Sequence, residues 1–369
     1  MVKKNDINKS ALKVNKGIDQ PSQINENAVK KITNRVKPQL KIDDYINGIL
    51  DGNRTILSRA ITLIESSLFE HQKLAQQIIE KCLPYSGKSL RIGITGVPGV
   101  GKSTFIEALG KHLTSLGHKL AVLAIDPSSE RTKGSVLGDK TRMEELSVDK
   151  NAFIRPSPSA GSLGGVARKT KETIILCEAA GFDIIFIETV GVGQSEITVH
   201  SMVDFFLLLM LAGAGDELQG IKRGIMEMAD AIVINKADND NLLKAKLAKR
   251  EYENALHLYP PTESGWTPVV DTCSAINNDR IVNVWEIITK YIALTKNNGY
   301  FDKNRRDQSV KIMYETINES LKNSFYSEKN IKKLLAEFEN DILNNKISSY
   351  VAAQKLLEIY FNKKKIDYQ

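Results

Sequence analysis

The sequence predicts an α/β fold in which a mostly parallel sheet is flanked by helices. Residues 85–300 alternate short apolar runs with stretches of helical apolar spacing, which is typical of successive βαβ units. The first run, Leu90–Thr95, leads into a glycine-rich segment at 96–103, and helical spacing follows over 103–117. A helical region before this alternation and another after it complete the predicted architecture.

The segment at 96–103 reads GVPGVGKS and matches G-x-x-x-x-G-K-[ST], the phosphate-binding loop of P-loop nucleoside triphosphatases. Backbone amides of such a loop surround phosphate oxygens, and the N-terminus of the next helix adds partial positive charge. We expect Lys102 to reach the β- and γ-phosphates and Ser103 to bind Mg²⁺. A glycine-rich turn before an ordinary helix is the alternative, which the Lys-Ser pair disfavours. The predicted phosphate-binding residues are Gly96, Val97, Pro98, Gly99, Val100, Gly101, Lys102, Ser103 and Thr104.

A second motif indicates which base is bound. The apolar run in ADAIVINKAD ends in an N-K-x-D tetrapeptide whose last residue is Asp238. This carboxylate can accept hydrogen bonds from guanine N1 and the 2-amino group, whereas adenine would leave it unpaired. Asn235 can hydrogen-bond the guanine edge or link neighbouring loops. The aliphatic part of the Lys236 side chain can lie over the guanine ring. A further short strand is predicted at Pro268–Ala275 and ends in Ser274 and Ala275, where a backbone N–H could bind guanine O6. The sequence therefore predicts GTP.

Acidic residues near strand ends predict a magnesium site. The apolar run Phe182–Ile187 is followed by Glu188, at the place where many GTPases carry the Asp of D-x-x-G. Asp126 ends another strand, and Asp139 follows in a Gly-Asp-Lys segment. Because strand ends of an open α/β sheet face one crevice, Asp126 and Glu188 converge on the phosphates, where Mg²⁺ keeps several waters. We expect the metal at Ser103, Asp126, Asp139 and Glu188, and catalytic roles for Lys102, Asp126, Asp139 and Glu188.

Two of these carboxylates also have a plainer interpretation: a solvated strand end for Glu188, and a simple turn for Asp139. The Gly191 N–H is the expected sensor of the γ-phosphate, so the segment after it should move on hydrolysis. The residue that positions the attacking water is not evident: Gln194 is a candidate, and an ordinary solvated loop residue is an equal alternative.

Six segments, in this order, resemble the methylmalonyl-CoA mutase-associated GTPases, the MeaB/ArgK-like family of the signal-recognition/metallochaperone branch: ITGVPGVGKSTFIEALG, AIDPSSERTKGSVLGDKTRM, FIRPSPSAGSLGG, IIFIETVGVGQSE, GDELQGIKRGIMEMAD and NKAD. The resemblance is dense over about residues 40–300. It implies a Mg²⁺-dependent GTPase that chaperones an adenosylcobalamin-dependent acyl-CoA mutase, gating cofactor loading and protecting the mutase from inactivation. It also implies a homodimer formed through the C-terminal helices.

In that family the functional residues map onto Lys102, Asp126, Asp139 and Glu188. A segment taken to signal to the mutase maps onto Asp216, Glu217, Gln219 and Lys222. The residues themselves support a segment that can swing, since it follows a predicted strand at Asp204–Ala212 and contains Gly213, Gly215 and Gly220. An ordinary loop is the alternative.

Three other functions compete with this interpretation. A nucleotide-switched interaction protein with negligible hydrolysis would need the same binding residues. A kinase of a basic amino-acid transport system would need a protein-substrate site, and the sequence contains no pattern that suggests one. A nickel-insertion GTPase usually carries clustered His or Cys ligands, whereas the five His and three Cys here form no CxxC or His-rich tract.

The net charge of +7 comes from the first 41 residues, which contain ten Lys and Arg against three Asp and Glu. The rest carries 41 of each, so we expect a neutral folded part and a disordered basic tail over 1–40. This tail lacks aromatic residues for base stacking, and the longest apolar run, Phe205–Gly213, is too short to span a bilayer. We therefore expect neither a nucleic-acid nor a membrane partner. Three separated cysteines favour a reducing, cytoplasmic location.

The predicted domains follow from these patterns. Residues 41–84 form an N-terminal cap of two or three helices, and residues 85–300 form the G domain. Residues 301–369 carry two amphipathic helices, over 308–326 and 330–361. Their apolar stripes need a surface to bury them. Packing on the parent domain is the simplest solution, and a dimerisation arm is the one that the resemblance implies.

Overall fold

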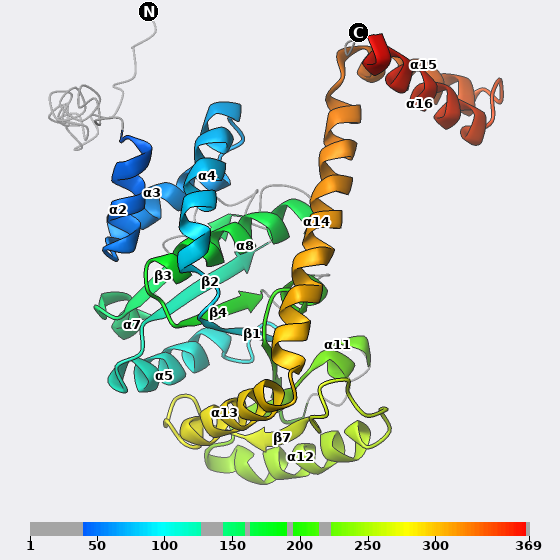
Figure 1. Cartoon of the computed structure of the whole chain (residues 1–369). Coiled ribbons are helices and arrows are strands. Elements are labelled where there is room, and N and C mark those ends of the chain that lie inside the picture. Colours follow the sequence, from blue (N-terminus) through cyan, green and yellow to red (C-terminus); the bar gives the residue numbers. More distant parts are fainter. Residues whose placement is uncertain (1–39, 127–142, 159–162, 190–194, 214–222, 367–369) are drawn as a thin grey trace, which may run out of the picture. The chain divides into compact units, whose positions relative to one another are not determined.

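The computed structural model describes residues 40–126, 143–158, 163–189, 195–213 and 223–366. The proposed disordered tail over 1–40 lies almost wholly outside these ranges. Contacts divide the chain after Lys41, and the part from Ile42 onwards forms one unit (Figure 1). Within the described residues, none of the helices is both long and apolar enough to cross a membrane.

The centre of this unit is a sheet in which all described strands run parallel, in the order β3-β2-β4-β1-β5-β6-β7. The strands are β1 (Leu90–Gly96), β2 (Leu120–Asp126), β3 (Ala152–Pro158), β4 (Ile184–Thr189), β5 (Phe205–Leu211), β6 (Ala231–Asn235) and β7 (Val269–Thr272). Every residue of β4 and β6 is buried, because helices cover both faces of a parallel sheet. The predicted α/β class is confirmed.

Two details of the strands differ from the sequence-based expectation. Strand β3 was not predicted, because its short apolar stretch is followed by Pro156 and Pro158. Proline is tolerated here since β3 lies at the edge of the sheet. Strand β4 begins and ends two residues later than expected, so Glu188 and Thr189 lie inside the strand rather than after it. The hydrogen bonds of the ladder therefore fix the backbone of Glu188.

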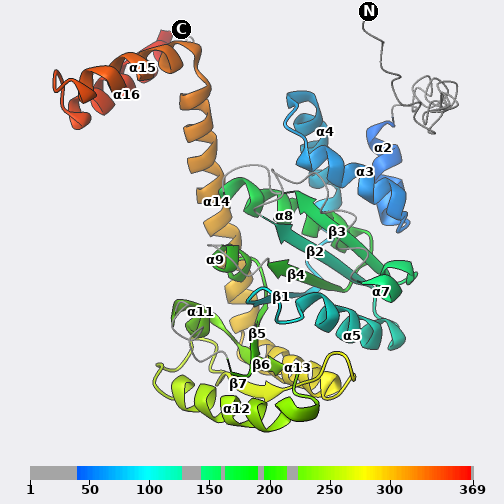
Figure 2. The ribbon, with the colours of Figure 1, turned by 180° about the vertical axis from the view of Figure 1, so that it is seen from behind.

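Helices cover both faces of the sheet (Figure 2). One face packs against α5 (Lys102–Ser115) and α13 (Ile281–Asn297) in a core that includes Phe105, Phe186 and Phe205. The other face packs against α8 (Leu163–Ala179), α9 (Ser195–His200) and α12 (Leu242–Leu256). The remaining short elements are η1 (Leu83–Tyr85), α7 (Glu144–Val148), α11 (Arg223–Met228) and η2 (Asn239–Asn241).

The N-terminal helices are α2 (Ile42–Leu50), α3 (Arg54–Glu65) and α4 (Phe69–Cys82). The Asn53 side chain caps α3 by accepting from the N–H groups of Thr55 and Ile56. Helix α3 lies against edge strand β3, and Arg54 donates to the Lys150 carbonyl at 2.8 Å and to that of Ala152. The arginine thereby satisfies carbonyls beside an edge strand that could otherwise pair with another chain.

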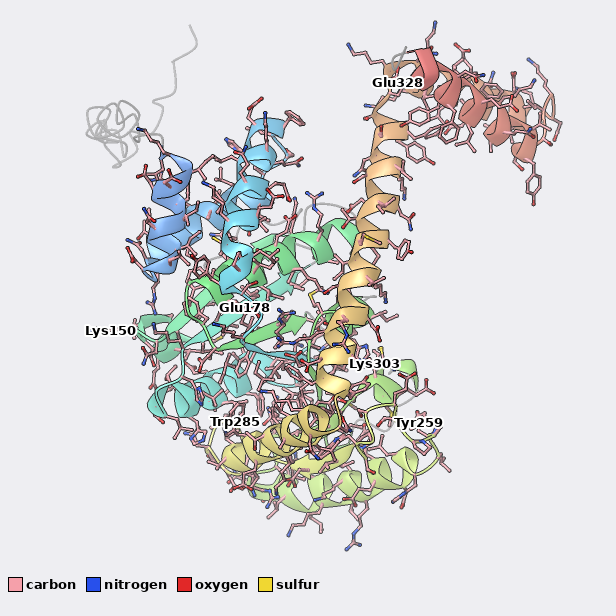
Figure 3. All side chains as sticks on the ribbon, viewed as in Figure 1. Lys150, Glu178, Tyr259, Trp285, Lys303 and Glu328 are labelled. Carbon is pink, nitrogen blue, oxygen red and sulfur yellow. The ribbon has the colours of Figure 1, made fainter. Side chains whose placement is uncertain are left out.

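The C-terminal region contains three helices where two were expected: α14 (Tyr300–Ser327), α15 (Lys329–Leu343) and α16 (Ser349–Ile366). Glu328, labelled in Figure 3, has extended backbone between α14 and α15. Helix α15 ends near Asn345, which adopts a positive φ of 55°, a common way to stop a helix. The apolar stripe of α15 packs against α16 around Ile331, Leu356 and Tyr360. Part of this stripe is therefore buried within the C-terminal region itself.

Candidate nucleotide site

The glycine-rich loop joins the buried centre of the sheet to α5. Gly96 and Gly101 adopt φ values of 149° and 93°, which L side chains rarely reach. A Cβ atom at Gly96 would lie 2.4 Å from the Leu209 carbonyl oxygen, and one at Gly101 would lie 2.8 Å from Nδ2 of Asn235. Close backbone packing therefore requires glycine at both positions. It brings the loop against β5 on one side and the end of β6 on the other.

Lys102 is the first residue of α5, and the residue is 9% exposed. Its Nζ donates to the carbonyl oxygens of Gly96 at 2.8 Å and Val97 at 3.3 Å, so the ammonium lies across its own loop. Neutral carbonyls are weaker acceptors than phosphate oxygens. The Lys102 ammonium therefore lies where phosphate oxygens of a bound triphosphate could replace the two carbonyl oxygens as its acceptors.

Two of the oxygen-bearing side chains expected to bind the metal, those of Ser103 and Glu188, lie next to each other in the structure. Ser103 Oγ donates to Glu188 Oε1 at 3.4 Å, and Glu188 is 8% exposed. Asp126 is the last residue of β2, two positions beyond the residue that pairs with Glu188, while its side chain lies outside the described residues. A hydroxyl beside a buried carboxylate is a hard oxygen set, which suits Mg²⁺ and its retained waters. Within the described residues, no three His, Cys, Asp or Glu side chains form a metal cluster.

Asn235, at the end of β6, links three segments. Its Nδ2 donates to the Val100 carbonyl at 2.9 Å, and its Oδ1 accepts from the Ala275 N–H at 3.2 Å and from the Cys273 thiol at 3.4 Å. The sequence suggested that Asn235 either bonds the guanine edge or links neighbouring loops, and these hydrogen bonds match the second role. Burial raises the pKa of Cys273 to about 12, so the thiol stays protonated and able to donate.

Lys236 adds a second link between the base-binding segment and the phosphate loop. Its Nζ donates to the Gly99 carbonyl at 2.8 Å, while its backbone turns with a φ of 57°. Asn241 Nδ2 donates to the Lys236 carbonyl at 2.7 Å and supports that turn. The stem of Lys236 therefore crosses between the two segments at which base and phosphates are expected.

Asp238 is held by a contact that sequence reasoning missed. Ser274 Oγ donates to Asp238 Oδ2 at 2.6 Å, whereas the sequence suggested only a backbone role for the segment of Ser274 and Ala275. The Ala237 N–H donates to the Cys273 carbonyl at 2.9 Å and keeps the two segments together. A Ser at the end of the next predicted strand after the N-K-x-D motif was the available signal.

Several predicted residues lie outside the described residues. They are Asp139, Gly191, Gln194, Asp216, Glu217, Gln219 and Lys222. The described site therefore contains the phosphate loop, the Ser103 hydroxyl beside the Glu188 carboxylate, and the whole N-K-x-D segment.

Similarity to known proteins identifies the family. A family model described as methylmalonyl Co-A mutase-associated GTPase MeaB matches residues 57–330. The chain belongs to this family. A probable GTPase of Mycobacterium tuberculosis is 49% identical over 318 residues, which cover 86% of this chain and 95% of that protein. The chain is accordingly a GTPase with a P-loop fold.

Two further relatives extend the comparison. A Mus musculus protein described as methylmalonic aciduria type A homolog, mitochondrial, is 44% identical over 334 residues, with 88% of this chain and 80% of that protein covered. A crystal structure described as LAO/AO transport system kinase is 37% identical and superposes with a TM-score of 0.70, covering 86% of this chain and 97% of that one. The fold described above is thus shared with a solved relative.

Proposed function

We propose that this GTPase acts as a Mg²⁺-dependent chaperone of an adenosylcobalamin-dependent acyl-CoA mutase, with methylmalonyl-CoA mutase as the client. In this proposal GTP gates cofactor loading, and the bound GTPase protects the mutase from inactivation. Membership of a family described as methylmalonyl Co-A mutase-associated supports the client. The mammalian relative, named for methylmalonic aciduria, supports it independently.

One observation carries the proposal that both motifs bind a single nucleotide: the N-K-x-D segment is bonded directly to the phosphate loop through Asn235 and Lys236. A base bound by Asp238 would therefore lie beside the loop that binds the phosphates, because Asn235 and Lys236 hold the two segments together. Asp238, oriented by Ser274, would accept from guanine N1 and the 2-amino group. The Ala275 N–H, which already bonds Asn235, lies in the segment proposed to face guanine O6.

In the proposed reaction Lys102 leaves the Gly96 carbonyl and donates to the β- and γ-phosphates, where negative charge develops. Ser103 and Glu188, with Asp126 and Asp139, would hold Mg²⁺. When bound, the metal neutralises charge on the phosphate oxygens. We also propose that Gly191 senses the γ-phosphate and that Asp216, Glu217, Gln219 and Lys222 report its state to the mutase.

Phosphate release from GTP tests this proposal, with and without purified methylmalonyl-CoA mutase and with and without Mg²⁺. We expect Mg²⁺-dependent turnover that changes when the mutase is added, and cofactor loading of the mutase that depends on the bound nucleotide. Lys102→Ala should abolish turnover. Lys111→Ala, on the same helix but in an exposed ion pair with Glu145, is the matched control.

The outcomes separate the parts of the proposal. Turnover at background in both conditions would favour the nucleotide-switched interaction protein. Normal turnover without any effect of the mutase on hydrolysis, or of nucleotide on cofactor loading, would reject the client alone.

We further propose a homodimer formed through α14. Its exposed stripe Val310, Met313, Tyr314, Ile317 and Leu321 repeats at helical spacing, with each side chain 45–59% exposed. We propose this stripe as the surface that a second copy would cover, because it follows one face of α14 over three turns. Ile317→Lys should shift the light-scattering mass towards monomer, whereas Asn323→Lys, exposed on the opposite face of α14, should leave it unchanged; a wild-type monomer contradicts the proposal. A cytoplasmic location also remains a proposal, supported by three free cysteines.

A further inference from the structure

Two adjacent residues at the start of α9 carry buried oxygen atoms without hydrogen-bond partners. Ser195 is 1% exposed and Glu196 is 3% exposed. Within the described residues, Ser195 Oγ and Glu196 Oε2 have no hydrogen-bond partner, and Glu196 belongs to no ion pair. A buried carboxylate is costly unless hydrogen-bond donors or a cation compensate its charge. These two oxygens therefore indicate a ligand that completes the site.

The spacing of α9 places the two oxygens over the carboxyl ends of β1 and β4. Helix α9 packs against both strands, and a Cβ atom at Gly93 of β1 would lie 2.9 Å from Val199 Cγ1. After Val199 the chain runs towards the amino end of β1, where the Asp204 N–H donates to the Arg91 carbonyl at 2.8 Å. Ser195, one helical turn before Val199, therefore faces the sheet about 5 Å nearer its carboxyl edge. In Figure 2, α9 lies at the arrowhead of β4.

Two threonine hydroxyls lie at the same level of the sheet. Thr95 is two residues beyond Gly93, so its side chain lies on the face of β1 that α9 covers. Its Oγ1 is 2.7 Å from Thr189 Oγ1 of β4, and both threonines are 1% exposed. One hydroxyl donates to the other, which leaves lone pairs on both oxygens. We call the four buried side chains of Thr95, Thr189, Ser195 and Glu196 the oxygen cluster.

The charge of the oxygen cluster selects the kind of ligand. Its three hydroxyls are neutral and Glu196 supplies one negative charge, so a single positive charge would make the buried site neutral. The N-terminus of the six-residue helix α9 offsets at most about half of that charge. A divalent ion would leave a surplus of positive charge, and a water molecule would leave the carboxylate uncompensated. Oxygen atoms alone are the ligands that hard cations prefer.

We propose that the oxygen cluster binds a monovalent cation, Na⁺ or K⁺. Glu196 Oε2 and Ser195 Oγ, the two oxygens without partners, would be its first ligands. The hydroxyls of Thr95 and Thr189 would complete the protein ligands from the strand side. The cation would then join α9 to the ends of two central strands.

The oxygen cluster is separate from the pair proposed for Mg²⁺ but is connected to it through the backbone. Glu188 and Thr189 are consecutive in β4, so their side chains lie on opposite faces of the sheet, and Glu188 accepts from Ser103 on the other face. Thr95 immediately precedes Gly96 of the phosphate loop. A cation in the cluster would therefore fix the strand ends that position both the loop and Glu188. We expect it to increase the rate of GTP hydrolysis.

Melting of the protein bound to GDP and Mg²⁺ tests this proposal. N-methylglucamine chloride, whose cation is too large for a buried site, is replaced by KCl or NaCl at constant ionic strength. We expect a saturable rise in melting temperature, since binding to the folded state stabilises it. Glu196→Gln should abolish that rise and should melt no lower than wild type in N-methylglucamine, because no uncompensated charge is then buried. Glu227→Gln, exposed on the neighbouring helix α11, is the matched control and should keep the wild-type response.

Two further measurements locate the cation. Wild type should broaden the sodium NMR resonance until KCl displaces Na⁺, and Thr189→Val, which removes one ligand, should reduce the broadening. GTP hydrolysis at fixed Mg²⁺ should rise with the same cation in wild type and Glu227→Gln but not in Glu196→Gln.

The proposal is overturned if neither cation raises the melting temperature above that in N-methylglucamine, or if Glu196→Gln responds like Glu227→Gln. It is also overturned if Glu196→Gln melts equally far below wild type in all three salts, as expected for a carboxylate that the protein alone holds. The mutase is absent from every measurement, so failure of the client proposal would not imitate these results.

Discussion

Arg305 fixes the first turns of α14 to the sheet, and its replacement by methionine tests how strongly. Its Nε donates to Asp204 Oδ1 at 2.7 Å and its Nη2 to Oδ2 at 2.6 Å. The same guanidinium donates to the carbonyls of Gly87 at 2.6 Å and Ser89 at 2.5 Å. The two charged side chains are 15% and 1% exposed, so water screens the pair poorly.

The expected loss follows from what remains after the change. Asp204 keeps the hydrogen bond from the Arg91 N–H at 2.8 Å but loses the cation that balances its charge. Removing one partner of a buried ion pair costs about 3–5 kcal/mol, because the other charge stays buried. We expect Arg305→Met to lower the free energy of unfolding by about that much, a large share of the ~5–15 kcal/mol typical of proteins. Arg306, next to it and exposed, is the control.

Urea unfolding of the GDP-bound protein, followed by circular dichroism, measures this difference. Hydrogen exchange over the first turns of α14 shows whether the loss is local or global. Arg306→Met should lie within about 0.5 kcal/mol of wild type, as surface substitutions do. If Arg305→Met is equally mild and α14 stays protected from exchange, the buried pair does not hold the helix, and the reasoning is refuted.

Three further predictions concern the nucleotide site and the core. Asp238→Asn should weaken GTP at least about a hundredfold and favour xanthosine triphosphate in competition titrations, since two hydrogen bonds to a charged group are worth about 1.5–3 kcal/mol each; unchanged GTP affinity would reject the guanine assignment. Gly101→Ala should weaken GTP more than Gly99→Ala does, because both have a positive φ but only the new Cβ at 101 meets Asn235 Nδ2, at 2.8 Å; equal losses would contradict this. Burial raises the pKa of Asp230 from 3.8 to about 7, so its contribution to stability is complete below pH ~4 and is lost as pH rises to ~7. Asp230→Asn should flatten the urea stability profile between pH 5 and 7, and an unchanged slope would exclude Asp230 as its source.

The strands that could be predicted best from the sequence are those in which every residue is buried. Strands such as β4 and β6 are covered on both faces, so their continuous apolar runs could be recognised directly. The phosphate loop and the N-K-x-D segment could be recognised because their geometry restricts residue type, as the close approach at Gly101 illustrates.

Other features depend on contacts between distant segments and could not be predicted locally. The hydroxyl of Ser274 matters because it meets Asp238, 36 residues away in the sequence. Edge strand β3 exists because β2 lies beside it, despite Pro156 and Pro158. Helix α15 is separated from α16 by a turn at Asn345, although the apolar spacing suggested one continuous helix.

The position of β1 between β4 and β5 has a consequence for biosynthesis. Leu90 pairs with Ile184, and Ile92 pairs with Phe205. Strand β1, which leads into the phosphate loop, therefore pairs with residues that follow it by about a hundred positions in the sequence. During translation β1 and β2 emerge as apolar segments before the strand that separates them exists. Pairings of such high sequence separation slow folding and expose aggregation-prone surface. Strand β1 therefore lacks one of its two neighbours until Leu211 has been synthesised, and we expect synonymous changes that alter translation speed before that point to affect soluble yield more than later ones.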